Sequence, residues 1–130
     1  MLTVPDNSYC FQALSVGQPL AAALSAQGLP AKFMSSSQFD LEEPGIKVTT
    51  LHAAKGLEFP IVILAHVEAG RLPRETAASD PEEIAAHLEE QRRLFFVGCT
   101  RAMRHLFITY DRQLPSPFLA DLTAEHWQRL

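Results

Sequence analysis

Residues 48–59 read VTTLHAAKGLEF and separate two apolar runs, residues 46–51 and residues 61–65. Short runs rich in Ile, Val and Leu, bounded by turn residues, predict β-strands. The polar sequence between them, HAAKGLE, begins at His52 and turns at Gly56. Polar and charged side chains at the end of a buried strand are costly unless they have partners. This stretch therefore indicates a functional turn between two strands.

Strand-like and helix-like segments alternate along the rest of the chain. A strand, a helix and a strand follow one another in the first part, which predicts parallel strands joined by a crossover helix. Continuous apolar strands without alternation are typical of a sheet covered on both faces. The sequence thus predicts a three-layer α/β domain with a mainly parallel sheet over residues 9–130, after a frayed start at residues 1–8. We expect strands at residues 9–14, 31–34, 46–51, 61–65 and 105–110, helices at residues 19–26, 81–98 and 123–127, and loops at residues 35–44 and 67–79.

The longest predicted helix carries the clearest local signals. Asp80 precedes Pro81 and two glutamates, which is the pattern of an N-cap, a proline in the first turn and acids at the positive end of the helix dipole. Ile84, Leu88 and Phe95 recur at helical spacing and form its apolar stripe. The first helix should end at a glycine C-cap two residues after residue 26.

Composition narrows the class of protein. The chain has 130 residues, of which 47% are hydrophobic, enough for one folded core. Its net charge is −4, so a nucleic-acid role would need a local positive patch or a partner domain that supplies most of the positive charge. Cys10 and Cys99 have no metal-type spacing and are expected to be reduced thiols, which favours a cytoplasmic protein. No apolar run approaches the roughly 18 residues of a membrane span, and we expect no secretion signal.

Two segments carry groups that could do chemistry, the turn that follows residue 51 and residues 99–104. Ligands of open α/β sheets bind beyond the carboxyl ends of the strands, and we expect both segments to lie there. A glycine-rich phosphate loop ending in Lys-Ser or Lys-Thr does not occur, so this chain cannot itself cradle nucleotide phosphates. The histidines are scattered and have no metal-ligand spacing, so no metal site is expected.

The individual residues in these segments admit two interpretations each. Arg101 is either a solvated arginine, or one paired with Glu89 or Glu90, or an arginine finger that neutralises charge on a phosphoryl group supplied by another domain. His52 is either a hydrogen-bonded packing residue or a binding residue. Glu58 either pairs locally or faces a ligand.

Two segments together resemble one known family. Residues 48–59 are similar to motif V of the UvrD/Rep/PcrA-like superfamily 1 DNA helicases, and residues 90–102, EQRRLFFVGCTRA, are similar to their motif VI. The two segments stand in the family's order, about thirty residues apart. Residues 106–119 resemble the tail of compact members, and residues 18–30 resemble the helix and turn that follow motif IV. The resemblance implies the second, C-terminal RecA-like domain of such a helicase, with a P-loop NTPase-like fold that lacks the phosphate loop.

In this family ATP lies between two RecA-like domains, and the resemblance assigns roles to single residues. It implies that ATP and Mg²⁺ are bound mainly by an N-terminal RecA-like domain outside this chain, and that Arg101 reaches the γ-phosphate as the catalytic arginine. Gly56 and Glu58 would approach the nucleotide, and Thr50 and His52 would lie toward the backbone of single-stranded DNA. The implied partners are single-stranded DNA and the N-terminal RecA-like domain in the same chain or complex, with movement from 3′ to 5′.

The chain departs from the family pattern in three places. The motif IV arginine falls near Ala13, the motif VI tyrosine is Phe96, and the large insertion between motifs IV and V is missing, as in compact relatives. We expect the chain alone to be inactive as an ATP hydrolase. Two alternatives stay open: a degenerate helicase-like domain that binds protein or DNA without hydrolysis, which Ala13 favours and Arg101 opposes, and an unrelated nucleotide-binding α/β protein.

Overall fold

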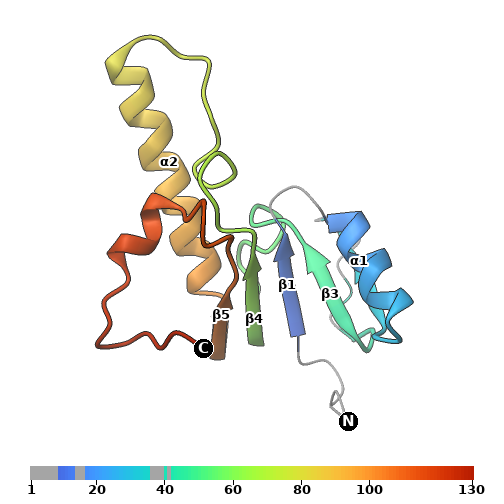
Figure 1. Cartoon of the computed structure of the whole chain (residues 1–130). Coiled ribbons are helices and arrows are strands. Elements are labelled where there is room, and N and C mark those ends of the chain that lie inside the picture. Colours follow the sequence, from blue (N-terminus) through green and yellow to red (C-terminus); the bar gives the residue numbers. More distant parts are fainter. Residues whose placement is uncertain (1–8, 14–16, 36–39, 41) are drawn as a thin grey trace.

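Five parallel strands form the centre of the molecule (Figure 1). The computed structural model describes residues 9–13, 17–35, 40 and 42–130, and the expected frayed start at residues 1–8 lies outside them. The strand order is β2-β3-β1-β4-β5, and every neighbouring pair is parallel, which confirms the predicted parallel sheet. The elements are β1 (Tyr9–Ala13), α1 (Gly17–Ala26), β2 (Ala31–Phe33), β3 (Ile46–Thr49), β4 (Phe59–Ala65), α2 (Pro81–Cys99), β5 (Ala102–Ile108) and the 3-10 helix η1 (Pro117–Asp121).

Two buried clusters on opposite faces of the sheet give the three layers that the sequence predicts. Val48 of β3 packs with Ala21 of α1 in one cluster. Val62 of β4 packs with Phe95 of α2 in the other. Across the paired strands Val48 is level with Ile63, and Val62 is one residue out of phase, so the two clusters face opposite ways. Burying a side chain of this kind contributes about 1.5–3 kcal/mol relative to leaving it exposed.

The helix α1 covers the β2–β3–β1 side of its face and leaves β5 uncovered. It ends at Gly28, whose φ of +79° is the left-handed conformation of a glycine C-cap. The N–H of Gly28 donates to Ser25 at 3.0 Å and that of Leu29 donates to Leu24 at 3.1 Å, which confirms the predicted end of this helix. On the uncovered part of the face, Phe107 of the edge strand stays 41% exposed.

The helix α2 begins as predicted, but only its second half packs on the sheet. The Asp80 carboxylate accepts a hydrogen bond from the N–H of Glu83 at 3.3 Å, an N-cap worth about 1 kcal/mol. Phe95 is buried, whereas Ile84 and Leu88 are 42% and 39% exposed, so the predicted apolar stripe is wrong for the first half. The reason is length: α2 has 19 residues and β4 has seven, roughly 28 Å against 23 Å. The start of α2 rises beyond the carboxyl ends of the strands (Figure 1).

The last helix is not where the sequence predicts it. Residues 124–126 make only a turn, closed by a hydrogen bond from the N–H of His126 to the carbonyl of Thr123 at 3.1 Å. The short helix is η1 instead, because Ser116 caps it and also donates to the carbonyl of Leu72. Phe118 then anchors η1 in the core, where it is 1% exposed. In the part of the chain that the structure describes, no helix is long and apolar enough to cross a membrane.

Candidate functional site

The turn between β3 and β4 leads from the carboxyl ends of the strands, called here the carboxyl edge of the sheet, back to their amino ends, the amino edge. β3 and β4 are both parallel to β1, which lies between them, so after Thr49 the chain must return to the amino ends of the strands before β4 can begin. Gln12 pairs with Thr49 and with Leu64, which puts the end of β3 level with a residue five positions beyond Phe59. At about 3.3 Å per residue, the turn therefore descends roughly 16 Å along the sheet.

This descent separates the predicted site residues into two groups. Thr50 and His52 follow β3 directly and lie at the carboxyl edge, whereas Glu58 and Arg101 immediately precede β4 and β5 at the amino edge. The prediction that residues 99–104 lie at the carboxyl ends of the strands is therefore wrong. A segment that leads from a helix into the next parallel strand has to meet that strand at its amino end.

Arg101 is held against the turn by hydrogen bonds to neutral oxygens. Its Nη1 donates to the carbonyl of Leu57 at 3.3 Å, its Nε donates to the carbonyl of Val97 at 3.1 Å, and its Nη2 donates to the hydroxyl of Thr100 at 3.1 Å. In return, the N–H of Phe59 donates to the carbonyl of Arg101 at 2.9 Å. The turn and the end of α2, which are 44 residues apart in the chain, thus form one unit at the amino edge.

The charge of Arg101 is not neutralised within the described part of the chain. Each of its three hydrogen bonds goes to a neutral acceptor, and Glu89 bonds to Arg93 at 3.2 Å instead. The interpretation of Arg101 as an ion-pair partner of Glu89 or Glu90 is therefore wrong. A guanidinium has five N–H donors, so two remain for an incoming anion.

Gly56 and Glu58 flank Leu57, whose carbonyl accepts from Arg101, and both have open surroundings. Gly56 has φ +83°, which favours glycine, and a Cβ added there would meet no atom within 4 Å. Glu58 and Lys55 are both exposed, and neither takes part in an ion pair among the described residues. The interpretation of Glu58 as a local pairing residue thus finds no support here.

At the carboxyl edge, Thr50 and His52 have different surroundings. The hydroxyl of Thr50 accepts from the N–H of Ala53 at 3.2 Å and its carbonyl accepts from the N–H of Ala54 at 3.1 Å, so Thr50 caps the turn. His52 is exposed, and its imidazole makes no hydrogen bond within the residues described. A packing role for His52 is excluded, and the ring is free to meet a ligand.

A contact between α2 and η1 supports the site, and the sequence did not reveal it. Arg92 pairs with Asp121, 29 residues away, and its guanidinium lies 5.2 Å over the ring of Phe118. That ring stacks on Phe95 at 5.9 Å between centroids. These contacts fix the helix whose end carries Arg101. No short-range sequence signal identifies Asp121, because its partner lies on a different element.

Cys99 adds no reactive group to the site. Burial raises the pKa of its thiol to about 12, so the reactive thiolate is scarce at neutral pH. Among the described residues, no group of three or more His, Cys, Asp or Glu side chains is placed to hold a metal ion.

The fold and the site define a class: a three-layer α/β domain with a parallel sheet that presents an unneutralised arginine and a glycine turn at one edge. Comparison with known families gives the assignment. Residues 9–113 match the model of the UvrD-like helicase C-terminal domain, and the chain belongs to this family.

Similar proteins agree with this assignment. The chain is 38% identical over 117 residues to DNA helicase II of Escherichia coli (strain K12), covering 82% of this chain and 15% of that protein. It is 39% identical over 111 residues to the ATP-dependent DNA helicase PcrA of Bacillus subtilis (strain 168), covering 83% of this chain and 14% of that protein. The solved C-terminal domain of a possible DNA helicase from Lactobacillus plantarum is similar with a TM-score of 0.67 and 26% identity, over 92% of this chain and 65% of that one. The chain thus spans about one seventh of the length of the curated relatives.

Proposed function

We propose that this chain is the second RecA-like half of an ATP-dependent DNA translocase and completes an ATP site whose phosphate loop and Mg²⁺ ligands belong to a first RecA-like domain. The observation that carries the proposal is the unit formed by Arg101, Leu57 and Phe59 at the amino edge. It leaves two guanidinium N–H groups unused, and Gly56, the residue before Leu57, has open space around its Cα. A positive group without a carboxylate partner, beside an empty surface, suits a phosphate brought by another domain.

In this proposal Arg101 neutralises charge on the γ-phosphate, and Gly56 and Glu58 face the nucleotide. His52 and Thr50 contact the backbone of single-stranded DNA at the opposite edge. Closing the cleft on ATP would bring the amino edge against the first domain, and opening after hydrolysis would release it. Because the same nine-residue turn ends at the DNA edge, each cycle would move the DNA contact, with movement from 3′ to 5′ as the family resemblance implies.

ATP hydrolysis by a helicase that carries this chain as its second RecA-like domain tests the proposal. Phosphate release should be stimulated by single-stranded DNA, and Arg101→Ala should lower turnover about a thousandfold or more, as the loss of an arginine finger does. ATP binding should change far less. Arg93→Ala is the matched control, because Arg93 is a 76% exposed arginine of α2 whose ion-pair partner among the described residues is Glu89.

Two results would overturn the proposal. The isolated 130-residue chain should hydrolyse no ATP, so DNA-stimulated turnover by that chain contradicts the shared site. Full turnover by the Arg101→Ala variant would instead favour the degenerate interaction module. A DNA strand labelled at its 5′ end reports the direction, since arrival of the motor there changes the fluorescence.

A further inference from the structure

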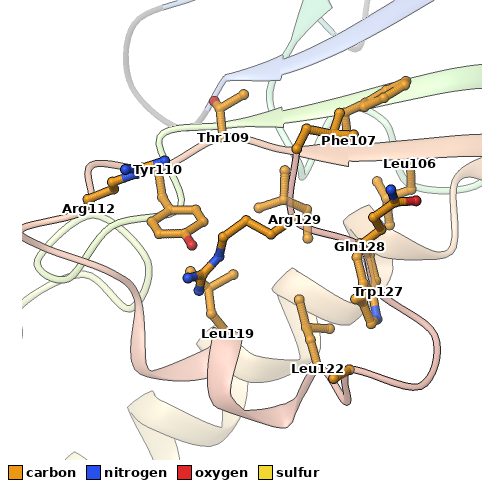
Figure 2. A pocket seen from close by; sticks show the side chains of 13 residues that line it. Leu106, Phe107, Thr109, Tyr110, Arg112, Leu119, Leu122, Trp127, Gln128 and Arg129 are labelled. Carbon is orange, nitrogen blue, oxygen red and sulfur yellow. The ribbon is translucent and has the colours of Figure 1, made fainter.

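A pocket of about 730 Å³ lies between β5, η1 and the C-terminal residues (Figure 2). This volume falls in the range of about 300–1,000 Å³ that is usual for ligand sites. Leucines such as Leu119 and Leu122 form an apolar part of its wall, and Tyr110 and Trp127 add aromatic surfaces. The 13 lining residues include two arginines and no acid.

The two arginines, Arg112 and Arg129, have no partner among the residues that the structure describes. Neither takes part in an ion pair or a hydrogen bond there. Three acids are close by in the sequence: Asp121 pairs with an arginine of α2, Asp111 accepts from a backbone N–H in its own turn, and the exposed Glu125 has no ion pair among the described residues. In Figure 2 the side chains of Tyr110 and Arg129 point toward one another across the pocket.

One end of the pocket, at Tyr110 and Arg112, lies at the edge of the sheet where the proposed DNA residues lie, whereas the C-terminus lies beside the amino end of β5 (Figure 1). Ile108, the last residue of β5, is level with Leu64, which is level with Thr49 at the end of β3. Tyr110 and Arg112 follow β5 directly, as Thr50 follows β3. Three strand spacings separate β3 from β5, roughly 14 Å at about 4.8 Å each. A single strand crossing this edge could therefore meet both places.

We infer that this pocket is a second single-stranded DNA contact, in which a base stacks on Tyr110 or Trp127 and the flanking phosphates meet Arg112 and Arg129. Sites for single strands combine aromatic stacking surfaces with cations that follow the backbone, and both are present in a pocket that no aspartate or glutamate side chain lines. The inference rests on the proposed function, since it extends the DNA path beyond Thr50 and His52. It also explains how a chain of net charge −4 presents positive charge locally.

The chain contains its own probe, because Trp127 is its single tryptophan. Titrating the 130-residue chain with the oligonucleotide dT20 should quench the tryptophan emission saturably. Arg112→Ala combined with Arg129→Ala should lower the salt slope of binding by about 1.4, since each single-strand phosphate contact contributes about 0.7. Taken over the decade from 1 M to 0.1 M salt, that slope predicts an affinity loss of about 25-fold at 0.1 M.

The control removes the same charge elsewhere. Lys32→Ala combined with Arg93→Ala deletes two cations from exposed ion pairs with Glu43 and Glu89, and this variant should keep the wild-type slope. An equal loss in both double variants would reduce the effect to net charge and overturn the site. So would an absence of quenching by dT20, or equal quenching by inorganic phosphate alone, which would indicate a simple anion site.

The same titration separates this inference from the proposed function. If His52→Ala weakens dT20 binding and the Arg112 and Arg129 double variant does not, the path at β3 stands and the pocket is refuted. The ATPase measurement on Arg101→Ala does not involve the pocket, so its failure would refute the translocase assignment whatever dT20 does.

Discussion

Replacing Gly56 by alanine tests whether the open space beside the turn belongs to a nucleotide. At φ +83°, a residue with a Cβ is strained by about 1–2 kcal/mol. About 0.5–1 kcal/mol of this strain is offset, because alanine loses less backbone entropy on folding than glycine. No clash adds to it, since the new Cβ meets nothing within 4 Å. We therefore expect Gly56→Ala to lower the free energy of unfolding by about 0–1.5 kcal/mol.

Two other glycines calibrate the stability measurement by urea unfolding of the isolated chain. Gly28 has nearly the same φ, +79°, and equally open surroundings, so Gly28→Ala should cost the same as Gly56→Ala. Gly45 has φ +108°, and its added Cβ would lie 2.7 Å from the backbone oxygen of Pro30. Gly45→Ala should therefore be clearly more destabilising than either, because a backbone atom cannot move aside cheaply.

Only Gly56 should matter for ATP. In a helicase that carries this chain, Gly56→Ala should lower kcat/KM for ATP at least tenfold, about 1.4 kcal/mol, because its methyl group enters the proposed nucleotide space. Gly28→Ala, matched in strain and stability, should stay within twofold of the wild type. Equal losses in the two variants, or no loss in Gly56→Ala, would refute the placement of the nucleotide beside this turn.

Three further predictions concern the arginine, the thiol and the core. Arg101→Ala should cost the isolated chain no more than about 1.5 kcal/mol in urea unfolding, because its bonds are half-exposed and go to neutral acceptors; a loss above 3 kcal/mol would make it chiefly structural. In the folded chain Cys99 should react with iodoacetamide at pH 8 about a thousandfold more slowly than in the unfolded chain, since folding raises its pKa from 9.0 to about 12. The free energy of unfolding should fall between pH 9 and 12, because the thiol of the unfolded chain ionises first. Fast labelling of folded Cys99, found by peptide mapping, would contradict this. Phe118→Ala should cost about 3–5 kcal/mol, whereas Phe96→Ala, at a side chain 67% exposed, should cost under about 0.5 kcal/mol; similar values for the two would show that η1 is not anchored in the core.

Local signals predicted the elements well, and long-range contacts explain what they left out. The cap at Asp80 and the glycine at residue 28 are encoded within one turn of helix, and the structure has both. The insertion of β3 between β2 and β1 depends on which strands pair across the whole sheet, and no local pattern states it. The short C-terminal helix was misplaced for the same reason, because it is η1, set by the contacts of Ser116 and Phe118 with distant parts of the core.

The motifs predict which residues form the site, but not how those residues are arranged. Sequence spacing brings Gly56 and Glu58 to one turn, and the resemblance adds Arg101. It does not say that Arg101 bonds to the carbonyl of Leu57, since every residue has a carbonyl and the choice follows from where α2 ends beside β4. The pocket at β5 had even less signal, because Arg112 and Arg129 are 17 residues apart in the chain and meet only through the path of the tail.

The bond between Arg101 and Leu57 has a consequence for the proposed cycle. Ala54, in the middle of the turn, is 0% exposed and anchors it, and Leu51, near its carboxyl-edge end, is 2% exposed. Its amino-edge end is tied to the arginine, and its carboxyl-edge end carries His52. If Arg101 moves toward a phosphate, it must either carry the Leu57 carbonyl with it or release that hydrogen bond. Either change alters the amino-edge half of a nine-residue turn that is fixed at its centre. In the proposed cycle the turn therefore couples the proposed nucleotide edge to the proposed DNA edge through its backbone.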